Sequence, residues 1–171
     1  MHEREIMRLI TIVCSMFFLA LSGIAYAQVN VAGTQRAEGF SSNIYGLGFS
    51  AGPASGVGIS FRDHLPSKSS YQLIAGIIKL KSKVSASVGA EYQYDLVRGN
   101  TTRFFFGPSA SYFYSGEHEN TFEAPFRFGV GLGGEFDVQE ALHISIEGVF
   151  TYFSDGSIVP LPQFAVHYYF Y

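Results

Sequence analysis

The stretch FRFGVGLGGEF, residues 126–136, alternates between large apolar residues and small or charged ones. Its even positions are apolar apart from one glycine, and they read Phe126, Phe128, Val130, Leu132 and Phe136. Its odd positions are glycines with a charged residue near each end, Arg127 and Glu135. Alternate residues of a β-strand point to opposite faces. The stretch therefore predicts a strand with one bulky apolar face and one nearly bare face.

The same two-residue period recurs along most of the chain, and outside the first residues no 3.6-residue helical period interrupts it. Turn-forming residues separate the alternating segments, for example at 52–53, 98–100 and 154–156. We therefore predict an all-β domain of eight strands, at about 43–51, 56–63, 71–81, 84–97, 103–115, 124–137, 141–153 and 163–171. Because Pro160 and Pro162 have no N–H to donate, we expect the last strand to pair fully only from Gln163.

The first 27 residues are typical of a cleaved secretory signal peptide. Arg8 precedes an apolar run from Leu9 to about Leu21, which is shorter than the ~20 residues of a membrane-spanning helix. Small residues follow, and the sequence predicts cleavage between Ala27 and Gln28. Cleavage would remove the chain's one cysteine, so disulfides and thiolate metal sites are excluded in the exported part.

Eight antiparallel strands with this alternation suit an up-and-down barrel of either of two kinds. Charged residues are 15% of the chain, against about 25% in soluble domains, and aromatic residues are 16%. The polar parity is mostly glycine and serine, which would fill the narrow lumen of an eight-stranded barrel, whereas the aromatic parity would overfill it. We therefore expect the apolar face to point outward into lipid. A secreted, soluble, lipocalin-like barrel that carries an apolar ligand is the alternative.

Two segments carry a resemblance to a known family. GGEFDVQEALHISIEGVF resembles the last periplasmic turn, and HYYFY the C-terminal assembly signal, of the small eight-stranded outer-membrane barrels of Gram-negative bacteria, the OmpA/OmpX/Ail group. Tyr171 fills the last aromatic place of that signal and Tyr169 the place two before it. The resemblance implies a periplasmic lead-in at 28–42 and a transmembrane barrel at 43–171, assembled by the barrel-assembly machinery.

The family also sets the expected surroundings of the protein. We expect outer-membrane lipid and lipopolysaccharide to be the partners of the protein. We also expect the protein to be a monomer. The formal net charge of −3 argues against a nucleic-acid partner.

Several charged residues fall on the lumen parity. Because an unpaired buried charge costs about 3–5 kcal/mol, these residues are expected to pair with one another. We predict a lumen charge network that plugs the barrel, and a gated or narrow ion path is the alternative reading. The network comprises Arg62, Glu91, Asp95, Arg103, Arg127, Glu135, His143 and Glu147, and His167 shares their parity.

His143, Ser145 and Glu147 also offer a base, a nucleophile and a carboxylate, as a hydrolase would need. Lipid A deacylases of the same barrel class have a similar His and Ser two residues apart, so a lipid-A-modifying enzyme is the alternative function. In this chain the parity directs all three side chains into the lumen. We therefore expect no enzyme activity and no cofactor.

KLKSK, at residues 79–83, places three lysines on one parity near a predicted hairpin tip. Counted from a periplasmic N-terminus, this tip faces the cell exterior, where lipopolysaccharide carries phosphates. Lys79, Lys81 and Lys83 are therefore candidate lipopolysaccharide contacts, with snorkelling or plain solvation as the alternative. The function predicted overall is an envelope-structural or surface-interaction role.

Overall fold

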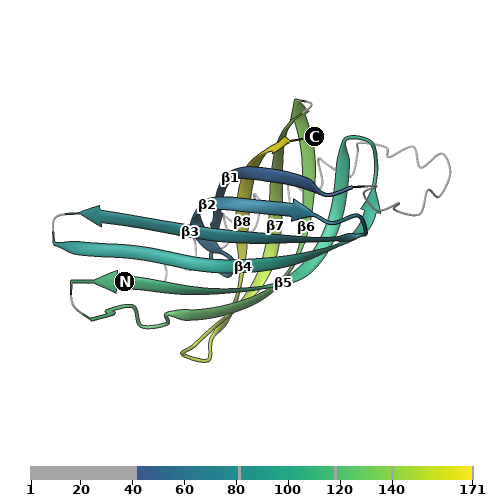
Figure 1. The fold of residues 1–171 in the computed structure, drawn as a ribbon. Helices are drawn as coiled ribbons and strands as arrows, with labels where there is room; N and C mark the ends of the chain where they lie inside the picture. Colours follow the sequence, from purple (N-terminus) through teal and green to yellow (C-terminus); the bar gives the residue numbers. More distant parts are fainter. Residues whose placement is uncertain (1–41, 81, 118, 140, 171) are drawn as a thin grey trace, which may run out of the picture. The chain divides into compact units, whose positions relative to one another are not determined.

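The computed structural model describes residues 42–80, 82–117, 119–139 and 141–170. They form eight antiparallel strands, each paired with its neighbours in sequence, and the last pairs with the first to close a barrel. These strands are β1 (Ile44–Gly52), β2 (Gly56–His64), β3 (Ser69–Leu80), β4 (Lys83–Arg98), β5 (Thr102–Gly116), β6 (Phe126–Gln139), β7 (Leu142–Phe153) and β8 (Ile158–Phe170) (Figure 1). The predicted all-β, up-and-down antiparallel barrel is therefore confirmed.

Within these ranges the structure contains no helix long and apolar enough to cross a membrane. The predicted signal peptide, with Ala27 and Gln28, lies outside the described residues, as does the lead-in apart from Ser42. Below, the terminal end of the barrel is the end where β1 begins and β8 finishes. The far end carries the β1–β2, β3–β4, β5–β6 and β7–β8 connections.

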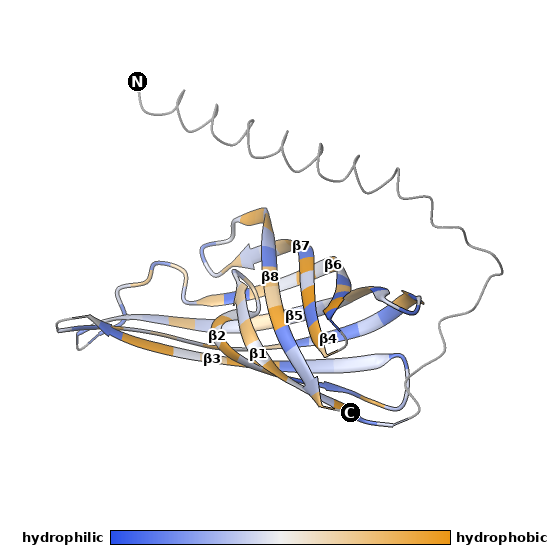
Figure 2. Cartoon of the chain, turned by 90° about the horizontal axis from the view of Figure 1, so that it is seen from above, coloured by the Kyte–Doolittle hydropathy of each residue, from blue (hydrophilic) through white to orange (hydrophobic). Residues whose placement is uncertain are grey.

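The two parities of the strands face opposite sides of the barrel wall, and Figure 2 shows the resulting alternation of hydrophobic and hydrophilic residues. On β6, Val130 and Leu132 point outward and are 59% and 64% exposed. Arg62 and Glu135 point into the lumen and are 0% and 3% exposed. The apolar parity therefore faces outward and the polar parity faces the barrel's own interior, as expected from the sequence.

The strand boundaries agree with expectation except at β8, which begins at Ile158 rather than at Gln163. Pro160 and Pro162 pair with Phe150 and Gly148 of β7, so the strand begins five residues earlier than predicted. Pairing of β8 with β1 begins only at Phe164, so pairing on both sides starts one residue from the expected Gln163. Residues 158–163 thus have a strand partner on one side alone, and a proline is tolerated where one edge of the strand is unpaired.

The β1–β2 hairpin is short and its turn, residues 53–55, folds into the barrel. Ala54 and Ser55 are fully buried, and Ser55 Oγ donates to Gln163 Oε1 on β8 at 3.1 Å. Glycine permits this path, because a Cβ at Gly89 of β4 would lie 2.1 Å from the carbonyl oxygen of Ser55. A Cβ at Gly58, whose φ is +150°, would lie 2.1 Å from the carbonyl oxygen of Ala75.

This inward path opens the barrel wall at the far end. β2 pairs with β3 only as far as Ile59 and Ala75. β1 pairs with β8 only as far as Ala51 and Phe164. Figure 1 shows the β3–β4 hairpin running on well past the end of the β1–β2 hairpin. The wall is therefore complete toward the terminal end. On the far-end side of the inward turn it is interrupted between β8 and β3.

Candidate functional site

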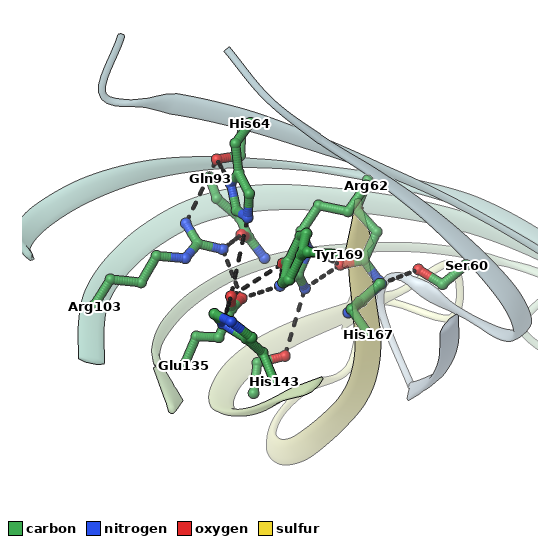
Figure 3. Close-up of polar contacts among 12 residues, drawn as sticks. Ser60, Arg62, His64, Gln93, Arg103, Glu135, His143, His167 and Tyr169 are labelled. Atoms are coloured by element: carbon green, nitrogen blue, oxygen red, sulfur yellow. Dashed lines mark hydrogen bonds and ion pairs between the residues drawn. The ribbon is translucent and has the colours of Figure 1, made fainter. Parts of the chain in front are cut away.

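Glu135 of β6 lies at the centre of a polar network inside the lumen (Figure 3). Its Oε2 accepts hydrogen bonds from Arg62 and from Nη2 of Arg103, the latter at 2.9 Å. Its Oε1 accepts from the hydroxyl of Tyr169 at 3.0 Å and from Nδ1 of His143 at 3.1 Å. These four partners come from β2, β5, β8 and β7, so one buried carboxylate ties together four strands besides its own.

The two arginines of this network have further partners. Arg62 donates from Nε to Gln72 Oε1 at 2.9 Å and from Nη1 to the hydroxyl of Tyr169 at 3.2 Å. Arg103 Nη1 donates to Asp95 Oδ1 at 2.7 Å. Arg103 therefore has two carboxylate partners, whereas Arg62 has one carboxylate and otherwise neutral groups. A charge-assisted bond to a buried guanidinium is stronger than a neutral one, so Glu135 matters most to Arg62.

The other two predicted glutamates are held by amides. Nε2 of Gln163 donates to Glu91 at 2.7 Å and to Glu147 at 2.9 Å. Gln93 also donates to Glu91, and the same Gln163 accepts from Ser55 of the inward turn. The lumen thus holds a second polar cluster, bound to the β1–β2 turn through one glutamine.

Arg127 differs from the other predicted lumen charges. Its guanidinium lies 4.1 Å from the ring centroid of Phe113, 5.2 Å from that of Phe122 and 4.9 Å from that of Phe153. Nη1 also donates to the carbonyl oxygen of Pro53 at 3.4 Å. None of the ion pairs among the described residues includes Arg127. It therefore lies outside the charge network to which the sequence assigned it, because aromatic rings surround it at this level.

The residues of the hydrolase alternative are used in three separate contacts. His143 bonds Glu135, and Ser145 Oγ accepts from Nη2 of Arg62 at 3.4 Å. Glu147 accepts from Gln163. These contacts hold the three side chains in the polar packing of the lumen, as the parity predicts.

The lumen also opens into a cavity of about 240 Å³ at the terminal end. His64, Arg103, Glu135, His143 and Tyr169 border it. Among the described residues, no group of three or more His, Cys, Asp or Glu side chains is placed to hold a metal ion. Glu135, the carboxylate that faces this cavity, already binds guanidinium groups, so the cavity offers a polar surface whose charges are largely paired.

The remaining predicted residues belong to the lysine group at the β3–β4 tip and to the proposed assembly signal at the end of the chain. Lys79 and Lys83 are exposed near the β3–β4 tip, and Lys81 lies outside the described residues. Of the proposed assembly signal, Tyr171 also lies outside the described residues. Tyr169 is buried in the lumen and bonds Arg62 and Glu135.

Sequence reasoning missed several members of the network. Gln72, Gln93 and Gln163 lie on the lumen parity of their strands, so extending the parity to neutral polar residues would have found them. His167 was noted by its parity, and its Nε2 lies 2.8 Å from Ser60 Oγ. His64 shares the parity of Arg62 but lies one residue past the expected end of its strand at 63, and it is buried where β2 ends.

No known protein family, curated protein or solved structure matches this chain. The barrel and its lumen are therefore the observations from which a function can be argued.

Proposed function

We propose that the protein is a small outer-membrane β-barrel without enzyme activity, whose plugged lumen serves an envelope-structural or surface-interaction role. One observation carries the proposal, namely the inverted distribution of side chains across the wall. Arg62 and Glu135 are buried inside, while Phe49, Val130 and Leu132 are exposed outside. A water-soluble barrel would hold these two classes of side chain the other way round, because burying charge is costly and burying apolar surface is favourable.

The outward apolar side chains extend over every strand of the barrel. Soluble monomers rarely expose a continuous apolar patch of more than a few hundred Å². Hydrocarbon would cover such a band, and closure through the β1–β8 pairing satisfies the backbone groups that lipid cannot bond. The band and the closed ladder together favour a lipid surrounding.

Exposed tyrosines lie side by side near the terminal end. Tyr45 and Tyr71 both pair with Asp63, and Tyr71 pairs in turn with Tyr92. The hydroxyl of Tyr71 donates to Asp63 at 2.8 Å. Aromatic rings with a polar tip suit the boundary between hydrocarbon and water. We infer that this row marks the periplasmic surface of the membrane.

The interior supports a structural role rather than general transport. The Glu135 network fills the lumen toward the terminal end, and the inward turn at 53–55 occupies it farther along. Tyr169 and Phe105 are among the largest fully buried side chains of the described residues. A lumen filled in this way has no space for the water column of a porin.

Surface interaction is assigned to the far end. Lys79 and Lys83 project at the β3–β4 tip, which by the same orientation faces the cell exterior. Ammonium groups there would attract the phosphates of lipopolysaccharide. The proposed contact is electrostatic and should weaken as salt is added.

The proposal is tested by placing a charge in the outer band. Val130→Lys should lower the stability of the barrel folded in lipid vesicles by about 2–4 kcal/mol, because a lysine near the bilayer centre must leave water. Ile158→Lys is the matched control, since Ile158 is also a β-branched, exposed residue but lies beside the far-end turn.

Folded protein is identified by its heat-dependent migration on a gel, and stability is measured by urea titration. If Val130→Lys is as stable as Ile158→Lys, and the native chain dissolves in buffer without detergent, the membrane assignment is wrong.

A further inference from the structure

A lateral groove lies where β2 leaves β3 at the far end of the barrel. Its volume is about 510 Å³, within the range of roughly 300–1,000 Å³ common for sites that hold small ligands. One side is formed by outer-face residues of the short hairpin, Phe49, Val57 and Ile59. The other side includes Ile78 and Phe113 of the longer strands. The groove therefore connects the outer face of the barrel with the inner face of the β3–β5 extension.

Ile74 and Ile78 show how the inner face becomes accessible. Both lie on the lumen parity of β3, four residues apart, yet Ile74 is 2% exposed and Ile78 is 61% exposed. β2 covers β3 only up to Ala75. Beyond that point the lumen-side residues Gly76 and Ile78 of β3 line the groove.

The long β5–β6 connection supplies the end wall of the groove. Phe122 packs on Phe113 with ring centroids 5.9 Å apart. Asn120 anchors the connection, because its Nδ2 donates to the carbonyl oxygen of Phe113 at 2.8 Å and its Oδ1 accepts from the N–H of Phe122 at 3.0 Å. Arg127 supports both rings through its guanidinium. The wall is thus a built aromatic surface rather than a loose loop.

The rim of the groove is polar, in contrast to its walls. Residues 76–80 of β3 have no strand partner on the β2 side among the described residues, so an edge of backbone N–H and C=O groups borders the groove. Lys79 follows Ile78 directly and pairs with Val84, next to Lys83. An apolar trough with an amide edge and two ammonium groups matches an amphiphile that has an acyl chain, an ester or amide linkage and an anionic head.

We propose that the groove binds one acyl chain of a phosphate-bearing lipid from the surrounding outer leaflet. The chain lies along Ile78 and the Phe113–Phe122 pair, the linkage bonds the open edge of β3, and the phosphate lies near Lys79 and Lys83. This inference rests on the proposed membrane location, because the groove opens onto the outer apolar face.

The test uses the absence of tryptophan from the chain, since any introduced Trp is then the only one. Two variants are groove reporters, Ile78→Trp on β3 and the aromatic-for-aromatic Phe122→Trp in the end wall. Leu132→Trp, on the outward face of β6 and away from the groove, is the outer-face control for general contact with lipid. Phe105→Trp is the buried control for a lumen position. Each variant is folded into phosphatidylcholine vesicles that contain phosphatidylglycerol, with bromine on the acyl chains of one lipid at a time.

We expect brominated lipid to quench both groove reporters nearly as strongly as the outer-face control, and to leave the buried control bright. Brominated phosphatidylglycerol should quench the Ile78→Trp reporter at about a thirtyfold lower mole fraction than brominated phosphatidylcholine, because two lysines attract its net negative headgroup. Adding Lys79→Ser and Lys83→Ser to that reporter should remove the preference, while the outer-face control remains quenched.

The controls separate the groove from the membrane assignment. If the outer-face control is quenched but both groove reporters behave like the buried control, the groove proposal is overturned and the membrane barrel stands. If the outer-face control is also unquenched, the membrane location itself fails. Equal quenching of the Ile78→Trp reporter by the two lipids overturns the anionic headgroup of the proposed occupant. Dimeric protein in which this reporter is unquenched would show that a second copy, rather than lipid, covers the open edge.

Discussion

Replacement of Glu135 by glutamine is the sharpest test of the lumen network. Both carboxylate oxygens accept from two donors each, Arg62 and Arg103 at Oε2 and His143 and Tyr169 at Oε1. A glutamine has the same shape but carries one NH₂ group. With the amide oxygen turned toward the two arginines, the NH₂ group can donate to His143 and to the hydroxyl of Tyr169, so what the substitution removes is the negative charge between Arg62 and Arg103.

The size of the stability loss follows from the partners that each arginine retains in Glu135→Gln. Arg103 retains the carboxylate of Asp95. Arg62 is 0% exposed and retains only neutral hydrogen-bond partners, among them Gln72 and Tyr169. Removing one member of a buried ion pair costs about 3–5 kcal/mol, so Glu135→Gln should destabilise the barrel by about 4 kcal/mol. With a urea slope of about 2 kcal/mol per molar, the unfolding midpoint should fall by about 2 M.

The assay is urea unfolding of the detergent- or vesicle-folded barrel, with the folded fraction measured from the gel shift. Glu147→Gln is the matched control, because Glu147 is another buried lumen glutamate and accepts from the amide of Gln163. We expect this control to cost less than about 1.5 kcal/mol, as is usual for a neutral hydrogen bond. Adding Arg62→Met to Glu135→Gln should recover part of the loss, since the uncompensated charge is then gone. Equal costs for the two glutamine variants, or full additivity with Arg62→Met, would refute the reasoning.

Two further predictions concern the inward turn and the far-end lysines. Gly89→Ala should lower the free energy of unfolding in urea by about 1–3 kcal/mol, because its Cβ would lie 2.1 Å from a backbone oxygen of the turn. Gly99→Ala is the control and should be neutral, since the nearest atom to a Cβ there is 3.5 Å away. Similar effects at both positions would contradict the inward path. Lys79→Ser/Lys83→Ser should weaken lipopolysaccharide binding to the detergent-folded protein by about 2 kcal/mol, at about 1 kcal/mol per lysine. Lys68→Ser, at the terminal end, is the control, and an equal loss there would rule out a specific far-end contact.

The architecture was predictable because strand parity is a local property. Alternation alone assigned Val130 and Leu132 to the outer face and Glu135 to the lumen, and the structure agrees. The partners of Glu135 were not predictable from the alternation. Arg62 and Tyr169 are 73 and 34 residues away from it in sequence, and only closure and register bring them together.

Other features depend on interactions that have no local signature. Arg127 fits the lumen parity as well as Arg62 does, but Phe113 and Phe153 from neighbouring strands receive its guanidinium. Tyr169 resembles part of an assembly signal, yet its odd position directs it into the lumen beside His167. A pattern states which face a side chain takes, and the partner it meets there is decided by the other strands.

One structural cause accounts for both the closed lumen and the open wall. β1 and β2 have nine residues each, against 16 in β4 and 15 in β5, so the hairpin ends partway up the barrel. Its turn bends inward, where Ser55 bonds Gln163 and the close approach to Gly89 requires a residue without Cβ. The bend removes the strand that would have covered Ile78 and the upper edge of β3. Gly89→Ala should push the turn out of the lumen and should therefore also change the shape of the lateral groove. The fluorescence of the Ile78→Trp reporter should then change when Gly89→Ala is added to it.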